Sequence, residues 1–259
     1  MFKYCSLYSG SSGNSFFVQS SHAKLIIDAG VSAKKIVTAL EEVNIDIKDI
    51  DAILVTHDHI DHTKSLAILS NKYNIPVYAS QKTWNSIPDI ANKILDNNKK
   101  IFNVLETFVI KDIKILPFST PHDAADPCGF NLYNSNKKIS IATDIGYVSE
   151  ELLNHLKNSS CILLESNYDP EVLKCSTYPY HLKQRILSNK GHLSNDCAGK
   201  ALSELYNFGL EKALLVHLSK ENNFPELAYE TIKSETLNCK NLSVDIAPRD
   251  NPSKLFDVC

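Results

Sequence analysis

Short apolar, β-branched runs recur along this chain, and each is typical of a buried strand. Residues 16–18 and 25–27 are expected to form two paired strands, and residues 53–56 a third. Four more strand signals lie between residues 107 and 143, where turns rich in Asp, Pro, Asn and Lys separate them. The last strands are expected at residues 161–165, 213–217 and 242–247. The chain therefore carries two strand-rich groups.

Helical spacing of apolar residues appears between and after these strands. Ser32 is a suitable N-cap for a helix that ends at Glu42, and Ile36 and Leu40 recur along it at helical spacing. Further helices are expected at residues 63–73, 149–157, 179–189 and 194–208. Two strand-rich groups that each carry helices predict two sheets packed face to face with helices outside. Because no repeat or linker divides the sequence, we expect one α/β domain over residues 1–259.

Composition places the chain among ordinary globular proteins. Of its 259 residues, 43% are hydrophobic, and the net charge of −3 gives no general sign of nucleic-acid binding. No apolar run is long enough to cross a bilayer, and the N-terminus lacks the core of a signal peptide. The seven cysteines form no CxxC pair, so we expect reduced thiols in a cytoplasmic protein, with Cys161 and Cys197 buried. Trp84 is expected in the core.

The densest group of metal-binding side chains is the run His57-Asp58-His59-Ile60-Asp61-His62, which follows the strand at residues 53–56. The carboxyl end of a strand is where α/β sheets commonly place their chemistry. In an extended segment residues i and i+2 point the same way, so His57 and His59 can reach one ion while Asp61 and His62 turn toward a neighbouring one. Imidazole and carboxylate ligands suit zinc, manganese or iron. The run therefore predicts a metal site.

Four other strand signals also end in residues that can bind metal. Asp28 and His122 follow apolar runs in the first half of the chain, and Asp144 and His217 follow apolar runs in the second. We expect these four side chains to join the first run at one edge of the sheets.

The Ser/Gly-rich segment at residues 9–15 leaves two interpretations open. Its backbone amides can bind a phosphate. It can equally form a tight hairpin that needs glycine at positive φ.

The order of these polar residues along the whole chain resembles that of the metallo-β-lactamase superfamily. The resemblance implies a four-layer αββα sandwich with two divalent metal ions between its sheets, and zinc or manganese is favoured. It assigns the first ion to three histidines, His57, His59 and His122. It assigns the second ion to Asp61, His62 and His217. Asp144 would bridge the two ions, and Asp28 would fix a histidine ring through its far nitrogen.

Several segments also resemble the bacterial YycJ/WalJ-like subfamily, namely residues 9–15, 121–124, 165–169, 178–186 and 191–195. Members of that subfamily are regarded as nucleases, so the likeness implies 5′→3′ exonuclease action on DNA rather than RNA. Gly191-His192 and His217-Leu218-Ser219 also resemble a pair of segments in tRNA 3′-processing endonucleases. There the first histidine is catalytic without binding metal, and the second binds metal. We therefore expect His192 to protonate the leaving group and Glu165 to orient it. Asp61 is expected both to bind metal and to accept the proton of the attacking water.

Two other functions remain open for the same site. A thioester, lactone or lactam hydrolase would use the metal ions but has less need of His192. An iron redox enzyme of this superfamily usually has glutamate at the second histidine of the run, where this chain has His59. A nucleic acid would need cations on its approach to the metals, and we expect Lys183, Arg185 and Lys220 to supply them.

Overall fold

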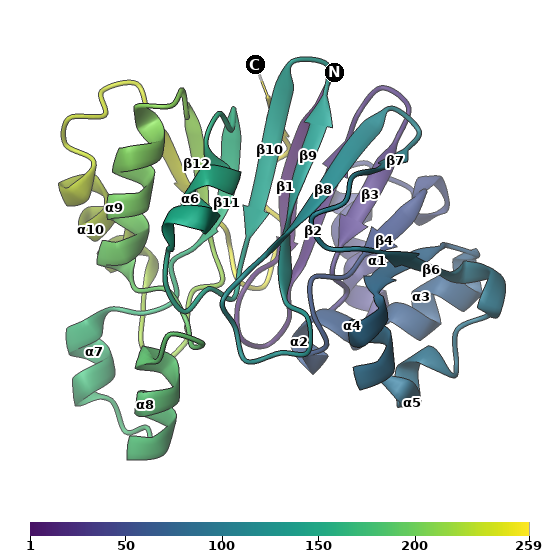
Figure 1. Ribbon diagram of the computed structural model, residues 1–259, viewed down its shortest axis with the longest axis horizontal. Helices are drawn as coiled ribbons and strands as arrows, with labels where there is room; N and C mark the ends of the chain where they lie inside the picture. Colours follow the sequence, from purple (N-terminus) through teal and green to yellow (C-terminus); the bar gives the residue numbers. More distant parts are fainter. Residues whose placement is uncertain (259) are drawn as a thin grey trace.

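The computed structural model describes residues 1–258 and contains two seven-stranded sheets that pack face to face (Figure 1). In sheet order, the first consists of β14 (Phe256–Asp257), β1 (Lys3–Tyr8), β2 (Ser15–Gln19), β3 (Lys24–Ile27), β4 (Ala52–Leu54), β5 (Val77–Ser80) and β6 (Lys99–Phe102). The second consists of β13 (Ser243–Ile246), β12 (Lys212–Val216), β11 (Cys161–Glu165), β10 (Lys137–Ala142), β9 (Cys128–Asn134), β8 (Ile113–Ser119) and β7 (Phe108–Ile110). Strands β3 to β6 run parallel, as do β10 to β13.

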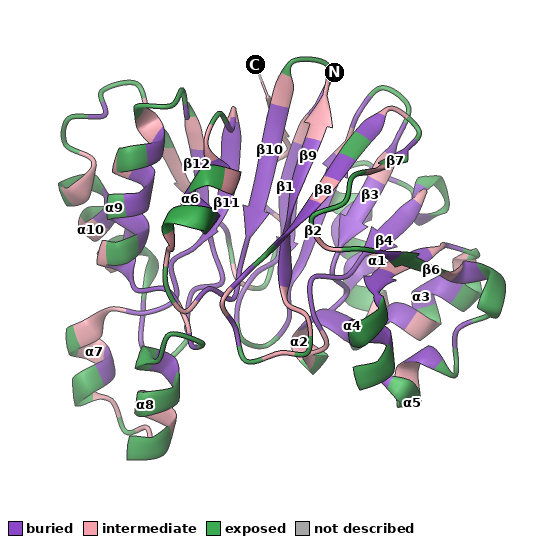
Figure 2. Cartoon of the chain, viewed as in Figure 1, coloured by how far each residue is buried: buried purple, intermediate pink, exposed green. Residues whose placement is uncertain are grey.

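Helices cover the outer face of each sheet (Figure 1). Those beside the first sheet are α1 (Ala33–Glu42), α2 (Ile60–Thr63), α3 (Leu66–Tyr73), α4 (Gln81–Ser86) and α5 (Pro88–Ala91). Those beside the second are α6 (Glu150–Leu156), α9 (Asn195–Tyr206) and α10 (Pro225–Glu235). The short pair α7 (Pro170–Cys175) and α8 (Tyr180–Leu187) projects from this body and is mostly exposed (Figure 2). Two 3₁₀ turns, Ile47–Asp49 and Asp96–Asn98, complete the described elements. This arrangement is the expected αββα sandwich.

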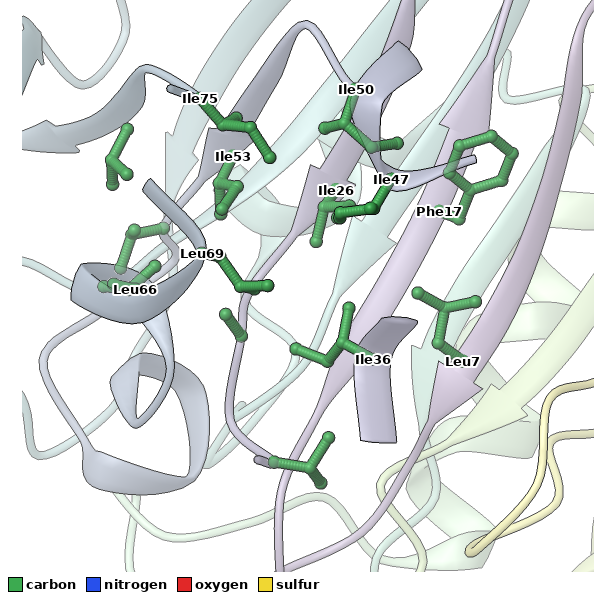
Figure 3. Close-up of a cluster of buried hydrophobic side chains, with 14 of the residues drawn as sticks. Leu7, Phe17, Ile26, Ile36, Ile47, Ile50, Ile53, Leu66, Leu69 and Ile75 are labelled. Atoms are coloured by element: carbon green, nitrogen blue, oxygen red, sulfur yellow. The ribbon is translucent and has the colours of Figure 1, made fainter. Parts of the chain in front are cut away.

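The central strands of each sheet are buried on both faces, because side chains alternate along a strand and the helices cover one face while the other sheet covers the second. On β3, Leu25 and Ile27 lie in the core between the two sheets, whereas Ile26 lies in the core under the helices. Figure 3 shows that outer core, in which Ile26 and Ile53 of the sheet lie near Leu66 and Leu69 of α3. A strand that is buried on both faces needs a continuous apolar run. For this reason a short run such as residues 25–27 predicts a strand.

Most of the expected elements are confirmed. All the strands expected from apolar runs are present within two residues, and the four strands between residues 107 and 143 are β7 to β10. The Ser32 and Ser149 side chains cap α1 and α6 by accepting hydrogen bonds from the Lys35 and Leu152 amides. The core position of Trp84 is confirmed, and Cys161 is buried. Cys197 is exposed on α9, so its expected burial is wrong.

The single helix expected over residues 63–73 is wrong. It is divided into α2 and α3, with a break at Lys64 and Ser65. The Ser65 amide donates to the Ala29 carbonyl, 2.9 Å away, and the Ala29 amide donates to the His62 carbonyl, 2.8 Å away. These two hydrogen bonds connect the residues around the break to the loop that follows β3.

The segment at residues 9–15 forms the hairpin between β1 and β2. Gly10 and Gly13 have φ angles of 148° and 150°, which favour glycine. The Gly10 amide donates to the Asn14 side chain and the Gly13 amide to the Gly10 carbonyl. Because these amides are already used, the hairpin interpretation is the better one.

Within residues 1–258, none of the helices combines the length and apolar character that a bilayer crossing requires.

Gly30 lies where the loop after β3 touches the loop before α2. A Cβ atom at this position would lie 1.6 Å from the Asp61 carbonyl oxygen. We predict that Gly30→Ala costs about 3 kcal/mol or more in the free energy of unfolding, since the backbone must move to relieve this overlap. Urea denaturation would measure the change.

Gly209→Ala is the control, because Gly209 has a φ of 88° and open space around its Cβ direction. It should cost only about 1–2 kcal/mol, the penalty for a left-handed non-glycine residue. Equal losses in the two variants would contradict the tight contact at Gly30.

Candidate metal centre

The expected site residues lie where strands of both sheets end. Asp28 follows β3, His122 follows β8, Asp144 follows β10 and His217 follows β12. The run that begins with His57 follows β4, which is parallel to β3 and adjacent to it. The two sheets face each other, so these ends meet at one edge of the sandwich. Figure 1 shows α2 at this edge and both chain termini at the opposite end.

Three of these strand-end residues have a left-handed backbone. The φ angles are 62° at Asp28, 57° at Asp144 and 60° at His217. Such a conformation costs a non-glycine residue about 1–3 kcal/mol and persists only where the surroundings enforce it. At Asp28 the amide donates to the Leu54 carbonyl, and at His217 the amide donates to the Ser9 hydroxyl, 2.7 Å away. These contacts hold the sharp turns at Asp28 and His217.

A first group of ligand atoms comes from His57, His59 and His122. One nitrogen from each ring lies within 4.8 Å of the others. The ring centroids lie 4.7 Å apart for His57 and His59 and 5.2 Å apart for His57 and His122. This spacing suits three imidazoles around one ion.

A second group comes from Asp61, His62 and His217, whose ligand atoms also lie within 4.8 Å of one another. Asp144 lies between the two groups. Its Oδ2 is 3.2 Å from His62 Nε2, and its Oδ1 is 3.6 Å from His122 Nε2. The structure thus brings all seven expected ligands together, with Asp144 between the two groups, and its bridging role stays a prediction.

Three histidine nitrogens in this cluster are available to bind a metal ion, because they have no hydrogen-bond partner among the described residues. His57 Nε2, His122 Nε2 and His217 Nε2 are buried and form no hydrogen bond with any part of the chain that the structure describes. Leaving a buried polar atom unpaired costs about 1–3 kcal/mol, so each such atom calls for an explanation. Neutral imidazole together with carboxylate is a donor set that suits divalent zinc or manganese. The residues present therefore fit divalent metal ions.

The other nitrogen of each buried histidine is held by the protein. His62 Nδ1 lies 2.7 Å from Asp28 Oδ2, and His217 Nδ1 lies 2.9 Å from Glu165 Oε1. His122 Nδ1 lies 3.0 Å from the carbonyl oxygen of Gly191. Such contacts fix the orientation of a ligand ring and the nitrogen that it offers. Asp28 lies where it was expected to hold a ring, and its role stays a prediction.

Opposite charges stabilise one another across the cluster. Burial opposes the charged form of His62, but the Asp28 and Asp144 carboxylates outweigh it and raise the pKa of His62 well above its usual value. At His217 burial is likewise outweighed by Asp144 and Glu165, which raise its pKa to about 9. Burial would raise the pKa of Asp144, yet His217 and His62 hold it well below its usual value. A buried site with this much negative charge attracts cations.

Glu165 and His192 lie beside the metal-binding cluster. His192 Nδ1 is 2.7 Å from Glu165 Oε1 and 3.8 Å from Asp144 Oδ1. Glu165 is fully buried, and its Oε2 accepts from the amides of Ile145 and Leu193. The expected contact between Glu165 and His192 is therefore present. In addition, Glu165 holds His217, which the sequence did not indicate.

Two further polar residues of the site were missed. The Asn14 side chain lies 3.1 Å from His62 Nε2, and Thr56 Oγ1 lies 3.0 Å from His57 Nδ1 and donates to Asp28 Oδ2. Asn14 was considered only as part of the hairpin at residues 9–15. Asn14 lies beside His62 only because of the register between β1 and β2. The spacing of residues in the sequence therefore does not predict this contact.

The sequence and the fold are similar to those of known proteins. The sequence profile of the β-lactamase superfamily domain matches residues 24–218. Exodeoxyribonuclease WalJ of Streptococcus pneumoniae is 41% identical over 236 residues, which cover 90% of this chain and 88% of the relative. Exodeoxyribonuclease YycJ of Bacillus anthracis is 38% identical over 238 residues, which cover 92% and 90%. The fold is similar to that of zinc-bound PqqB from Methylobacterium extorquens, with a TM-score of 0.75, 15% identity and coverage of 98% and 100%.

The metal content of purified variants distinguishes the side chains that bind metal from those that only lie beside it. We predict that the purified protein binds two equivalents of zinc or manganese and that Asp144→Ala loses metal, because the carboxylate shared by both groups is removed. His192→Ala should keep near-normal metal content. Elemental analysis after dialysis would measure both, and a metal-depleted His192 variant would make His192 a ligand.

Proposed function

We propose that this chain, which belongs to the β-lactamase superfamily, is a dinuclear metal-dependent hydrolase of phosphodiester bonds that digests DNA from its 5′ end. The sequence resemblance to that superfamily and to its YycJ/WalJ-like subfamily is confirmed. The relatives named exodeoxyribonucleases support the substrate class. The observation that carries the proposal is the Glu165–His192 pair beside Asp144.

The pair supports a step in which the leaving oxygen needs a proton. An alkoxide is a poor leaving group, and a positioned imidazole is well suited to protonate it. The contact with Glu165 occupies Nδ1 of His192, so its Nε2 is available to face the substrate. His192 is partly exposed, whereas Glu165 is buried beneath it.

The remaining groups complete a plausible hydrolytic site. Two bound divalent ions would supply the positive charge that hydrolysis of a phosphate diester requires. Asp61 is the more exposed carboxylate of the cluster, and we assign it the proton of the attacking water. Asp144, His57, His59, His62, His122 and His217 would hold the ions.

The approach for a polyanion is proposed along α7 and α8. Residues 170–191 contain four Lys or Arg residues and one acidic residue, whereas the whole chain has a net charge of −3. Arg185 on α8 is anchored by Asp123, with Nε 2.6 Å from Oδ2. Asp123 in turn lies 3.4 Å from His122 Nε2 through its Oδ1. The basic surface of α8 thus reaches the edge of the metal cluster.

A direct test uses duplex DNA and RNA that carry a label at the 5′ or the 3′ end, in Mn²⁺ or Zn²⁺. We predict release of the label from the 5′ end of DNA as a mononucleotide. His192→Ala should reduce the rate by about 10²–10⁴-fold, the usual contribution of general acid catalysis. Ready hydrolysis of a neutral lactone, with no cleavage of any nucleic acid, would instead favour an acyl hydrolase.

Salt dependence tests the proposed approach. The logarithm of the binding constant for duplex DNA falls linearly with the logarithm of the salt concentration. The slope is about −0.9 for each phosphate that the protein neutralises. Reversing Lys183 and Arg185 to glutamate should therefore flatten the slope by roughly two units. Binding would be measured with His192→Ala to prevent turnover. The same reversal at Lys99 and Lys100, on the distant strand β6, is the control and should change the slope little. If both double variants behave alike, α8 is not the approach.

A further inference from the structure

A cavity of about 570 Å³ opens beside His192. It lies between α6, α9 and the loop at residues 146–149, which follows Asp144. Cavities of about 300–1,000 Å³ hold single small ligands, so this one is large enough for a mononucleotide and too small for a length of duplex. His192 is the residue shared by the cavity and the metal-binding edge.

The cavity wall is suited to a flat, partly apolar group. Its apolar members include Val148, Leu153 and Leu193, and its aromatic members are Tyr147 and Tyr168. Tyr147 is 45% exposed, so its ring is accessible to a ligand. Nucleobases stack on such side chains largely irrespective of their identity.

The charged residues of the wall balance one another. Lys157 and Lys200 are offset by Glu150 and Glu204. A wall of this kind gives no net attraction for a chain of phosphates. It therefore favours recognition of a nucleoside by its base over recognition of a strand by its backbone.

We infer that this cavity receives the terminal nucleotide of the digested strand, on the leaving-group side of the cleaved bond. The inference rests on the proposed function. If His192 protonates the leaving oxygen, the nucleotide that carries this oxygen must lie against His192. The cavity is the space that His192 lines, and it holds one nucleotide.

The reaction can be written for digestion from the 5′ end. A bond forms between the oxygen of water and phosphorus, and the bond between phosphorus and the 3′ oxygen of the terminal nucleotide breaks. The proton of His192 passes to that 3′ oxygen, and the proton of water passes to Asp61. The products are a nucleoside 5′-monophosphate in the cavity and a strand with a new 5′ phosphate. A cavity that holds one nucleotide predicts that the enzyme releases mononucleotides.

Cys197 provides a direct probe of occupancy because it lines the cavity and is exposed. Cys175 is also exposed, lies on α7 outside the cavity wall, and serves as an internal control. The metal-loaded protein would be alkylated with iodoacetamide in the presence of deoxyadenosine 5′-monophosphate, and each cysteine followed by peptide mass spectrometry. At ten times the dissociation constant, labelling of Cys197 should slow about tenfold while that of Cys175 is unchanged. Deoxyribose 5-phosphate, which lacks a base, should protect much less.

Substitution of Tyr147 tests recognition of the base. Tyr147→Ala should raise both the dissociation constant of the mononucleotide, measured by protection of Cys197, and the KM for DNA, each by roughly fivefold to a hundredfold, because stacking is lost. Tyr147→Phe should retain both. Tyr229→Ala is the matched control, since Tyr229 is 38% exposed on α10 and lies outside this cavity.

The outcomes separate the inference from the proposed function. Digestion of DNA without protection of Cys197 by the mononucleotide, and with normal KM in Tyr147→Ala, would overturn the inference and leave the nuclease intact. Protection of Cys197 by the mononucleotide in a protein that cleaves no nucleic acid would support a nucleotide site and overturn the exonuclease. Equal protection by deoxyribose 5-phosphate would overturn recognition through the base.

Discussion

The whole site depends on one constraint, which is that each buried histidine is held by one nitrogen so that the other faces a common space. The Thr56 hydroxyl holds His57, Glu165 holds His217 and the Gly191 carbonyl holds His122. The free nitrogens come from segments that are far apart in the sequence. An apolar core alone gives no reason for such an arrangement, because each unpaired buried nitrogen lowers stability. A cation shared by these nitrogens would remove that cost.

The same constraint explains where the fold is strained. Asp28, Asp144 and His217 adopt left-handed conformations at strand ends, and Gly30 allows its loop to pack directly on the Asp61 carbonyl. Backbone strain of this kind tends to occur at functional sites. The surrounding sheets supply the rigidity that maintains it, because their central strands are packed in apolar cores on both faces. The stability of the core thus supports a site that by itself would be unfavourable.

Much of the site could be predicted from the sequence because its residues share a local signature. Each of Asp28, His57, His122, Asp144 and His217 is the first residue able to bind metal after an apolar strand, and parallel strands bring such ends together. The role of Asn14 could not be predicted, since it reaches His62 only through the hairpin register. The break between α2 and α3 depends on hydrogen bonds to Ala29, a contact between distant segments. Exposure of Cys197 depends on which face of α9 packs inward, and one residue type does not determine that.

The most direct test of this account is anomalous X-ray scattering from crystals of the protein grown with zinc or manganese. The account predicts two peaks about 3.5–4 Å apart, the usual spacing in two-metal sites. One peak should lie among His57, His59 and His122, and the other among Asp61, His62 and His217. A single peak, or a peak bound by His192 in place of His217, would contradict it.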